Sequence, residues 1–226
     1  MSKRRLDITG RLSPGMWSYR ATMDDVPPFE QRRWATIPER GWEADWFAMP
    51  TLAGTYLETA KHLIEGGESI DEVTLDKLFI PASIAVIPKQ PAGHITVADL
   101  EQTVSVLNPG DALLLSTGWD RLWWDDGAVF VAHSPHFELE AMQWIVDHGV
   151  SILGGDIPCF DDPRPEHGQG VNTPLFESGA MILAPLVGLG SWGASRAHLT
   201  VLPIPLKGAC GAPCRAILTE FEGEKS

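Results

Sequence analysis

Short apolar runs separated by amphipathic segments dominate the chain after about residue 80. Residues 82–87 and 112–116 are rich in Ile, Val and Leu and are bounded by Pro or Gly, as buried strands usually are. Between them, Thr96 can cap a helix that begins at Val97 and runs to about Leu107, with Asp99 near its start. The pattern therefore predicts a strand, a helix and a second strand.

The same alternation repeats towards the C-terminus. The segment 138–147 places Leu139, Met142 and Ile145/Val146 on one helical face, and a strand over 150–153 follows it. Thr173-Pro174 can begin a short helix that ends at Gly179. Further strands are predicted at 181–183, 199–204 and 216–218. We therefore expect an α/β fold with a mixed sheet and few helices.

Residues 1–50 show no clear periodicity and carry prolines that discourage helix, so we expect them to be extended and rich in loops. This segment holds Trp17, Trp34, Trp42 and Trp46, which are four of the nine tryptophans in the chain. Rings of this size need to be buried on the protein's own sheet, on a second subunit or over a ligand. A length of 226 residues favours one domain, 1–226, with 1–50 as its extended N-terminal segment.

Charge and composition exclude several classes of partner. The net charge of −13 repels phosphate backbones and anionic membrane surfaces, so we expect no nucleic acid and no membrane partner. The longest apolar stretch, 181–194, is interrupted by Pro and Gly and is too short for a membrane span. No apolar run follows the basic residues near the N-terminus, so we expect a cytoplasmic protein. The three cysteines do not suggest a disulfide framework and are expected to be reduced.

The segment 52–62 carries the best candidate for chemistry. Gly54-Thr55 can form a bend, after which Tyr56, Glu58 and His62 follow. If the chain turns helical there, Glu58 and His62 share one face and the carboxylate can orient the imidazole, as in an acid/base pair. The alternative is a solvated helix face that has no chemical role.

Other polar stretches give weaker signals. Trp119 and Asp156 follow predicted strands, where loops of α/β sheets often build sites, although a packed Trp and a turn-capping Asp explain them as well. Asp156 with its neighbours Asp161 and Asp162 suggests either a cation or turn capping. His133 and His136 are separated by a Pro and are interpreted as helix-entry residues. Phosphate-binding glycine motifs and a serine-hydrolase elbow are absent from the sequence.

Taken in order, these stretches resemble the cyclase family that includes bacterial kynurenine formamidases and isatin hydrolases. The resemblance covers nearly the whole chain, and its best parts are Ser116-Thr-Gly-Trp119, Gly155-Asp156 with Asp161, and residues 175–189. It implies a swivelling β/β/α fold and an oligomer, a homodimer or larger, in which the N-terminal segment helps to line a pocket. It also implies metal-dependent hydrolysis of a small amide, formamide or lactam.

The sequence departs from that family at the metal signature, which has the form HxGTHxDxPxH. Leu52 and Tyr56 stand at the first two His positions, Glu58 replaces the Asp, and only His62, the family's acid/base histidine, is unchanged. Ala60 replaces the Pro, and further along the chain Asn172 and Ala184 occupy the positions of a His and a Glu ligand. Because such a site needs about three imidazole, carboxylate or thiolate donors, we expect the family's Zn or Mn to be absent.

The first hypothesis is therefore a metal-independent enzyme that acts on a small organic molecule by acid/base catalysis. Glu58 and His62 would move protons while Tyr56 and Asn172 hold a polarised oxygen. Other residues expected to contact the substrate are Trp17, Trp119, Phe160 and Asp156. The alternatives are a metal-dependent amide or lactam hydrolase that uses substitute ligands, such as Asp156, Asp161 or His167, and a non-catalytic ligand-binding protein.

Overall fold

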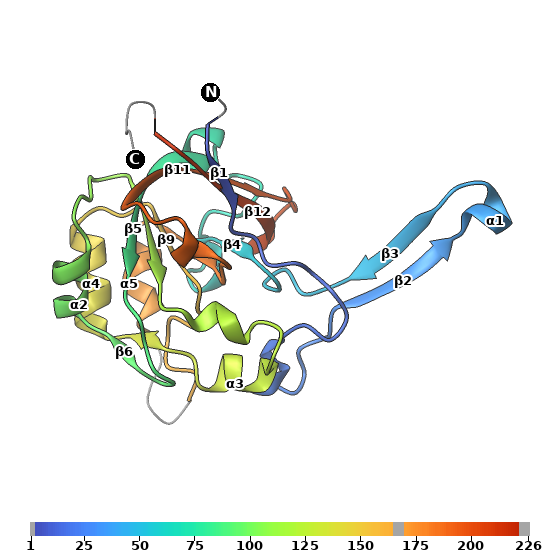
Figure 1. The fold of residues 1–226 in the computed structure, drawn as a ribbon, viewed down its shortest axis with the longest axis horizontal. Helices are drawn as coiled ribbons and strands as arrows, with labels where there is room; N and C mark the ends of the chain where they lie inside the picture. The colour runs from blue at the N-terminus through green and yellow to red at the C-terminus, as the bar shows by residue number, and fades with distance from the viewer. Residues whose placement is uncertain (1–2, 165–169, 222–226) are drawn as a thin grey trace.

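The computed structural model describes residues 3–164 and 170–221, and its main feature is a curved sheet of eight strands (Figure 1). The strand order is β1-β12-β11-β5-β7-β9-β10-β4, and β4 also pairs with β12, so that the sheet closes on itself. The strands are β1 (Arg5–Asp7), β4 (Tyr56–Glu58), β5 (Phe79–Val86), β7 (Ala112–Ser116), β9 (Ile152–Gly155), β10 (Met181–Ala184), β11 (Arg196–Pro203) and β12 (Gly211–Thr219).

Parallel and antiparallel pairings coexist in this sheet. The strands β5, β7, β9 and β10 are mutually parallel, whereas β1, β4, β11 and β12 join by antiparallel pairs. Helices α2 (Val97–Thr103), α3 (Gly127–Ala132), α4 (Leu139–Asp147) and α5 (Asn172–Glu177) connect the parallel strands, and β6 (His94–Ile95) pairs with β8 (His136–Phe137). The prediction of an α/β fold with a mixed sheet and few helices is confirmed.

Two apolar cores lie on the two faces of the sheet, because successive side chains of a strand point in opposite directions. Leu113 and Leu115 of β7 belong to the core that the helices cover. Leu114, between them, belongs to the core that β5, β11 and β12 enclose. Every residue of β7 is buried, as expected for a parallel strand covered on both faces.

The helices differ in detail from the prediction. Thr96 caps α2 in a capping box with Asp99, but the helix ends at Thr103 and does not reach residue 107. In α4, Met142 and Ile145 are buried as expected, whereas Leu139 is exposed because Ala141 takes its place in the core. The first turn of α5 begins at Asn172, one residue before the expected cap. None of the described helices has the length and apolar character that a membrane span needs.

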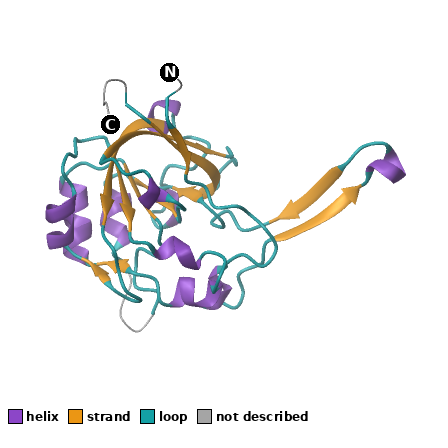
Figure 2. Cartoon of the chain, in the orientation of Figure 1, coloured by secondary structure: helices purple, strands orange, loops and turns teal. Residues whose placement is uncertain are grey.

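The N-terminal segment has two parts with opposite environments. Trp17 is buried and packs edge-on against Trp123 at a ring-centroid distance of 5.6 Å. Farther along, β2 (Glu30–Ala35) and β3 (Ala44–Ala48) form a hairpin with α1 (Ile37–Arg40) at its tip, and this arm projects away from the sheet (Figure 2). Trp34, Trp42 and Trp46 lie on the arm and are exposed. The chain alone therefore buries one of the four N-terminal tryptophans.

Asp156 connects the loops that leave β7 and β9. Its side chain is fully buried and accepts hydrogen bonds from the backbone N–H groups of Thr117 and Gly118 and from the Thr117 hydroxyl, at 2.6–2.9 Å. Gly118 has a φ of +75°, which favours glycine in this turn. Burial raises the pKa of Asp156 to about 6, against the opposing effect of these hydrogen bonds. Asp156 thus fixes the start of the loop 156–163.

Asp156→Ala is expected to lower the free energy of unfolding by about 3 kcal/mol, because several buried donors lose their acceptor at once. Urea unfolding followed by tryptophan fluorescence measures the change. Asp147→Ala, at the exposed end of α4, is the matched control and should change stability by less than about 0.5 kcal/mol. Equal effects of the two substitutions would contradict the anchoring role of Asp156.

Candidate active site

The short strand β4 supplies two polar side chains to one face of the closed sheet. Tyr56 and Glu58 are two residues apart and point to the same side, whereas Leu57 points into the opposite core. Glu58 pairs with Ile182 of β10 on one side and with Gly211 of β12 on the other. A Cβ atom at Gly211 would lie 2.7 Å from the Leu57 carbonyl oxygen, so a glycine is needed for this close approach.

A tight turn after β4 brings His62 back towards the strand. Ala60–His62 form a 3-10 turn, and His62 Nε2 lies 3.4 Å from Glu58 Oε1. The pairing of Glu58 with His62 is therefore present, although Glu58 lies in a strand and not in the helical turn that would place both on one helix face. Glu58 pairs with the strands on both sides of β4, so it cannot join a helical turn. The short turn at residues 60–62 instead brings the His62 ring close to the Glu58 carboxyl group.

Burial perturbs both members of this pair in the direction that favours their neutral forms. The Glu58 side chain is 7 % exposed, and burial together with the nearby charge of Asp161 raises its pKa to about 8. Burial also lowers the pKa of His62 below its usual value of 6.5, although the ring is 40 % exposed. At neutral pH the site therefore holds a protonated carboxylic acid next to a neutral imidazole.

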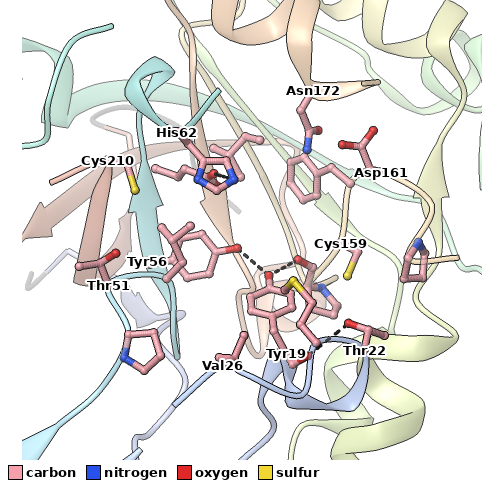
Figure 3. A pocket seen from close by; sticks show the side chains of 18 of the residues that line it. Tyr19, Thr22, Val26, Thr51, Tyr56, His62, Cys159, Asp161, Asn172 and Cys210 are labelled. Atoms are coloured by element: carbon pink, nitrogen blue, oxygen red, sulfur yellow. Dashed lines mark hydrogen bonds and ion pairs between the residues drawn. The ribbon is translucent and has the colours of Figure 1, made fainter. Parts of the chain in front are cut away.

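The two tyrosines of the chain meet in the same site. The Tyr19 hydroxyl lies 2.6 Å from the carbonyl oxygen of Pro158 and 2.7 Å from the Tyr56 hydroxyl (Figure 3). A carbonyl only accepts, so the single hydroxyl proton of Tyr19 goes to Pro158, and Tyr56 must donate to Tyr19. Burial raises the pKa of both phenols well above 10, which keeps them neutral. Tyr56 therefore presents an acceptor, not a donor, to the space beside it.

These residues form one wall of a cavity of about 440 Å³, a volume typical of small-molecule sites. On the other side lie Asn172, at the start of α5, and Asp161, in the loop after β9 (Figure 3), and Phe160 of that loop also lines the cavity. Asp161 Oδ1 accepts the backbone N–H groups of residues 170 and 171, at 3.0 and 2.6 Å, and so holds the beginning of α5. The Asn172 Oδ1 atom is buried and has no hydrogen-bond partner among the described residues.

Three residues that we expected at the substrate lie elsewhere. Trp17 is in the core behind Tyr19, at a ring-centroid distance of 5.2 Å, where it supports that tyrosine. Trp119 is fully buried and donates its indole N–H to the carbonyl oxygen of Phe130. Asp156 is enclosed by the donors of the loop after β7. Among the described residues, the cavity lining includes Tyr56, Glu58, His62, Phe160 and Asn172 but none of these three.

The structure also adds residues that the sequence reading missed. Tyr19, Cys159 and Cys210 line the cavity, and burial raises the pKa of the Cys159 thiol to about 12, so this thiol is not a reactive thiolate.

The interpretation of His136 as a helix-entry residue is wrong. It is buried in β8, with Nε2 3.4 Å from Asp162 Oδ2, because this segment pairs with β6 in a separate two-stranded parallel sheet.

The side chains present do not suit the family's divalent metal. At the positions of its ligands, Leu52 is apolar, Tyr56 has a phenol that remains protonated, and Asn172 offers an amide. Ala184 is buried in β10 without any donor. No group of three or more His, Cys, Asp or Glu side chains among the described residues is arranged to hold a metal ion. Of the substitute ligands considered, Asp156 is sequestered, and His167 lies outside the described residues.

Comparison with known proteins agrees with the fold. Residues 6–162 match the family described as "Putative cyclase". The chain is 27 % identical to the kynurenine formamidase of Erythrobacter litoralis over 227 residues, which cover 97 % of this chain and 96 % of that protein.

Solved structures share the same architecture at low sequence identity. Isatin hydrolase A from Ralstonia solanacearum superimposes with a TM-score of 0.84 at 21 % identity, covering 97 % of this chain and 92 % of that one. A structure titled as a potential metal-dependent hydrolase with cyclase activity gives a TM-score of 0.76 at 21 % identity, covering 98 % and 100 %. The expected cyclase-like fold is confirmed. By its family match and its fold, the chain belongs to the cyclase family.

Proposed function

We propose that this cyclase-family chain is an enzyme that transforms a small organic substrate by acid/base catalysis without a metal. Ring closure, ring opening, dehydration and isomerisation are the reaction types that such proton transfers serve. The observation that carries the proposal is the pair formed by Glu58 and His62, 3.4 Å apart at the wall of a cavity. A donor set that does not suit a divalent ion supports the metal-independent form of the reaction.

The protonation states assign the roles. Neutral His62 is the general base, and its partial exposure lets it reach a substrate in the cavity. Protonated Glu58 is the general acid, because its raised pKa of about 8 allows it to keep a proton at neutral pH and release it in the reaction. Proton transfers of this kind contribute about 10²–10⁴-fold, which suits an activated substrate better than an ordinary amide.

Metal-dependent hydrolysis of an amide or lactam is the second candidate, and the kinship with kynurenine formamidase and isatin hydrolase favours it. The two candidates differ in metal content. Protein purified without chelators would carry about one or more tightly held Zn or Mn ions per chain if substitute ligands exist. Activity that is lost in EDTA and restored by Zn or Mn would decide for the second candidate.

His62→Ala is expected to lower kcat by at least about 100-fold while changing the affinity for a substrate analogue by less than a few-fold, because the imidazole moves a proton and is not the main binding contact. Steady-state kinetics and calorimetric titration measure the two effects. His198→Ala, on β11 outside the cavity, is the matched control. Unchanged turnover in His62→Ala would instead favour a non-catalytic binding protein.

The pH profile of kcat/KM is expected to be bell-shaped. On the acid side, activity falls as His62 gains a proton, at a pH below 6.5 because its pKa is lowered. On the alkaline side, activity falls near pH 8 as Glu58 loses the proton that it must donate. Glu58→Gln should lower kcat and abolish the alkaline limb while leaving the acid limb. An alkaline limb that persists in Glu58→Gln would exclude Glu58 as the general acid.

We also propose that the active form is a homodimer or larger assembly in which a second copy of the chain covers the arm, residues 30–48. A two-stranded hairpin is marginally stable alone, and this one exposes Trp34, Trp42, Trp46 and Phe47. Its strands lead directly to Val26 and Pro50 at the cavity, so packing on the arm would also order the cavity wall. A cytoplasmic location remains an expectation from the sequence.

Replacing both Trp34 and Trp42 by Ser is expected to lower the mass of the assembly, because their rings pack edge-on with a centroid distance of 5.4 Å and form one exposed apolar surface. Sedimentation velocity at micromolar concentration measures the mass. Trp124→Ser removes an equally exposed ring outside the arm and should leave the mass unchanged. A wild-type monomer, or a double variant of unchanged mass, would contradict the role of the arm.

A further inference from the structure

The polarity of the cavity constrains the molecule that can occupy it. The Tyr56 hydroxyl donates its proton to the Tyr19 hydroxyl, which in turn donates its own proton to the Pro158 carbonyl oxygen. The Tyr56 hydroxyl can therefore act only as an acceptor towards an occupant of the cavity. Asn172 also lines the cavity, but its Oδ1 atom is enclosed by protein and has no hydrogen-bond partner among the described residues, so an occupant of the cavity does not reach it. The acceptor that the cavity offers is therefore the Tyr56 hydroxyl oxygen, and an occupant that donates a hydrogen bond there is favoured.

The charges around the cavity have one sign. The described lining holds the carboxyl groups of Glu58, which is protonated, and of Asp161 and Asp162, but no Lys or Arg. Arg164 binds Asp162 through two side-chain hydrogen bonds, at 2.7 and 2.8 Å, and compensates that carboxylate. Among the described residues, Asp161 is bound by the backbone N–H groups of residues 170 and 171, and its charge acts on Glu58. An anion that enters would therefore meet the negative charge of Asp161 and no cation of the described lining.

The remaining wall is apolar. Met23, Val26 and Leu52 lie on the side of the N-terminal segment, and Phe160 and Ile182 lie deeper in the cavity. Aromatic and aliphatic side chains of this kind cover a flat body, while a few polar atoms fix its orientation.

We propose that the cavity selects a small flat ligand that bears no negative charge and directs an N–H or O–H donor towards Tyr56, with a cationic head preferred to a neutral one. This inference rests on the proposed function, in that it describes the substrate class of the same site. It makes Tyr56 and Asp161 specificity-determining residues, the first as a hydrogen-bond acceptor and the second through its charge.

Three probes of nearly equal shape test the inference: benzamidinium, benzamide and benzoate. They share a phenyl ring and differ in the charge and the donors of the planar head. Calorimetric or NMR titration of the wild-type protein should give binding at least about tenfold tighter for benzamidinium than for benzoate, with benzamide between them. Asp161→Asn keeps the acceptor for the backbone N–H groups but removes the charge, and should reduce this ratio to about threefold or less.

Tyr56→Phe should weaken benzamidinium and benzamide by at least about fivefold and leave benzoate nearly unchanged, because only the first two donate to the Tyr56 hydroxyl oxygen. Asp147→Asn, on the exposed end of α4, should leave all three affinities unchanged. Benzoate that binds as tightly as benzamidinium, a ratio unchanged in Asp161→Asn, or binding by none of the three probes would overturn the proposal. These titrations measure binding and need no turnover, so the two proposals can fail independently of each other. The probes can bind with equal affinity although His62→Ala abolishes turnover, and they can differ as expected although His62→Ala retains turnover.

Discussion

A carboxyl group buried in the strand that closes the sheet is the constraint on which the rest of the site depends. Glu58 lies in β4 between Ile182 of β10 and Gly211 of β12, so its backbone is fixed on both sides. No cation of the described cavity lining compensates it, and the charge of Asp161 opposes its ionisation. Its surroundings hold such a group neutral, which lowers the stability of the fold as the pH rises from about 4.5 to about 8 and keeps a proton donor in the site at neutral pH. A buried acid whose raised pKa lowers the stability of the fold is typical of functional sites.

The N-terminal segment sets the polarity of the space in front of that acid. Trp17 packs behind Tyr19, and Tyr19 donates to the Pro158 carbonyl oxygen in the loop that Asp156 anchors. The direction of each proton in this chain of contacts follows from the carbonyl at its end, because that atom can only accept. A segment far from β4 in the sequence thus decides that Tyr56 receives a hydrogen bond from whatever occupies the cavity. The same segment continues into the arm, so the arm and Tyr19, which sets the polarity of the cavity, belong to one continuous stretch of backbone.

Local signals in the sequence were sufficient where local interactions determine the structure. The apolar run 112–116 coincides with β7, and the capping box of Thr96 with Asp99 begins α2 as expected. The sequence identified Glu58 and His62 as a pair, but it did not reveal that Glu58 lies in a strand, because pairing with β10 and β12, distant in sequence, decides the conformation of β4. The contact of Tyr19 with Tyr56 joins residues 37 apart and leaves no periodic signal. Asp156 and Trp119 follow strands as site residues often do, and only packing reveals that they turn inward.

The metal-free and the metal-dependent reaction require different charges on the Glu58 side chain. A carboxylate binds a divalent ion only after it has lost its proton, so a metal held by Glu58 would require the ionised form that burial and Asp161 disfavour. A general acid requires the opposite state. The replacement of neighbouring donors by Leu52, Tyr56 and Ala184 removes partners that a metal would need and leaves the apolar surroundings that keep the acid protonated. A wall that lacks metal donors and an acid that stays protonated are therefore consistent with each other, and the proposed chemistry accordingly places both proton donor and proton acceptor on this strand and its turn.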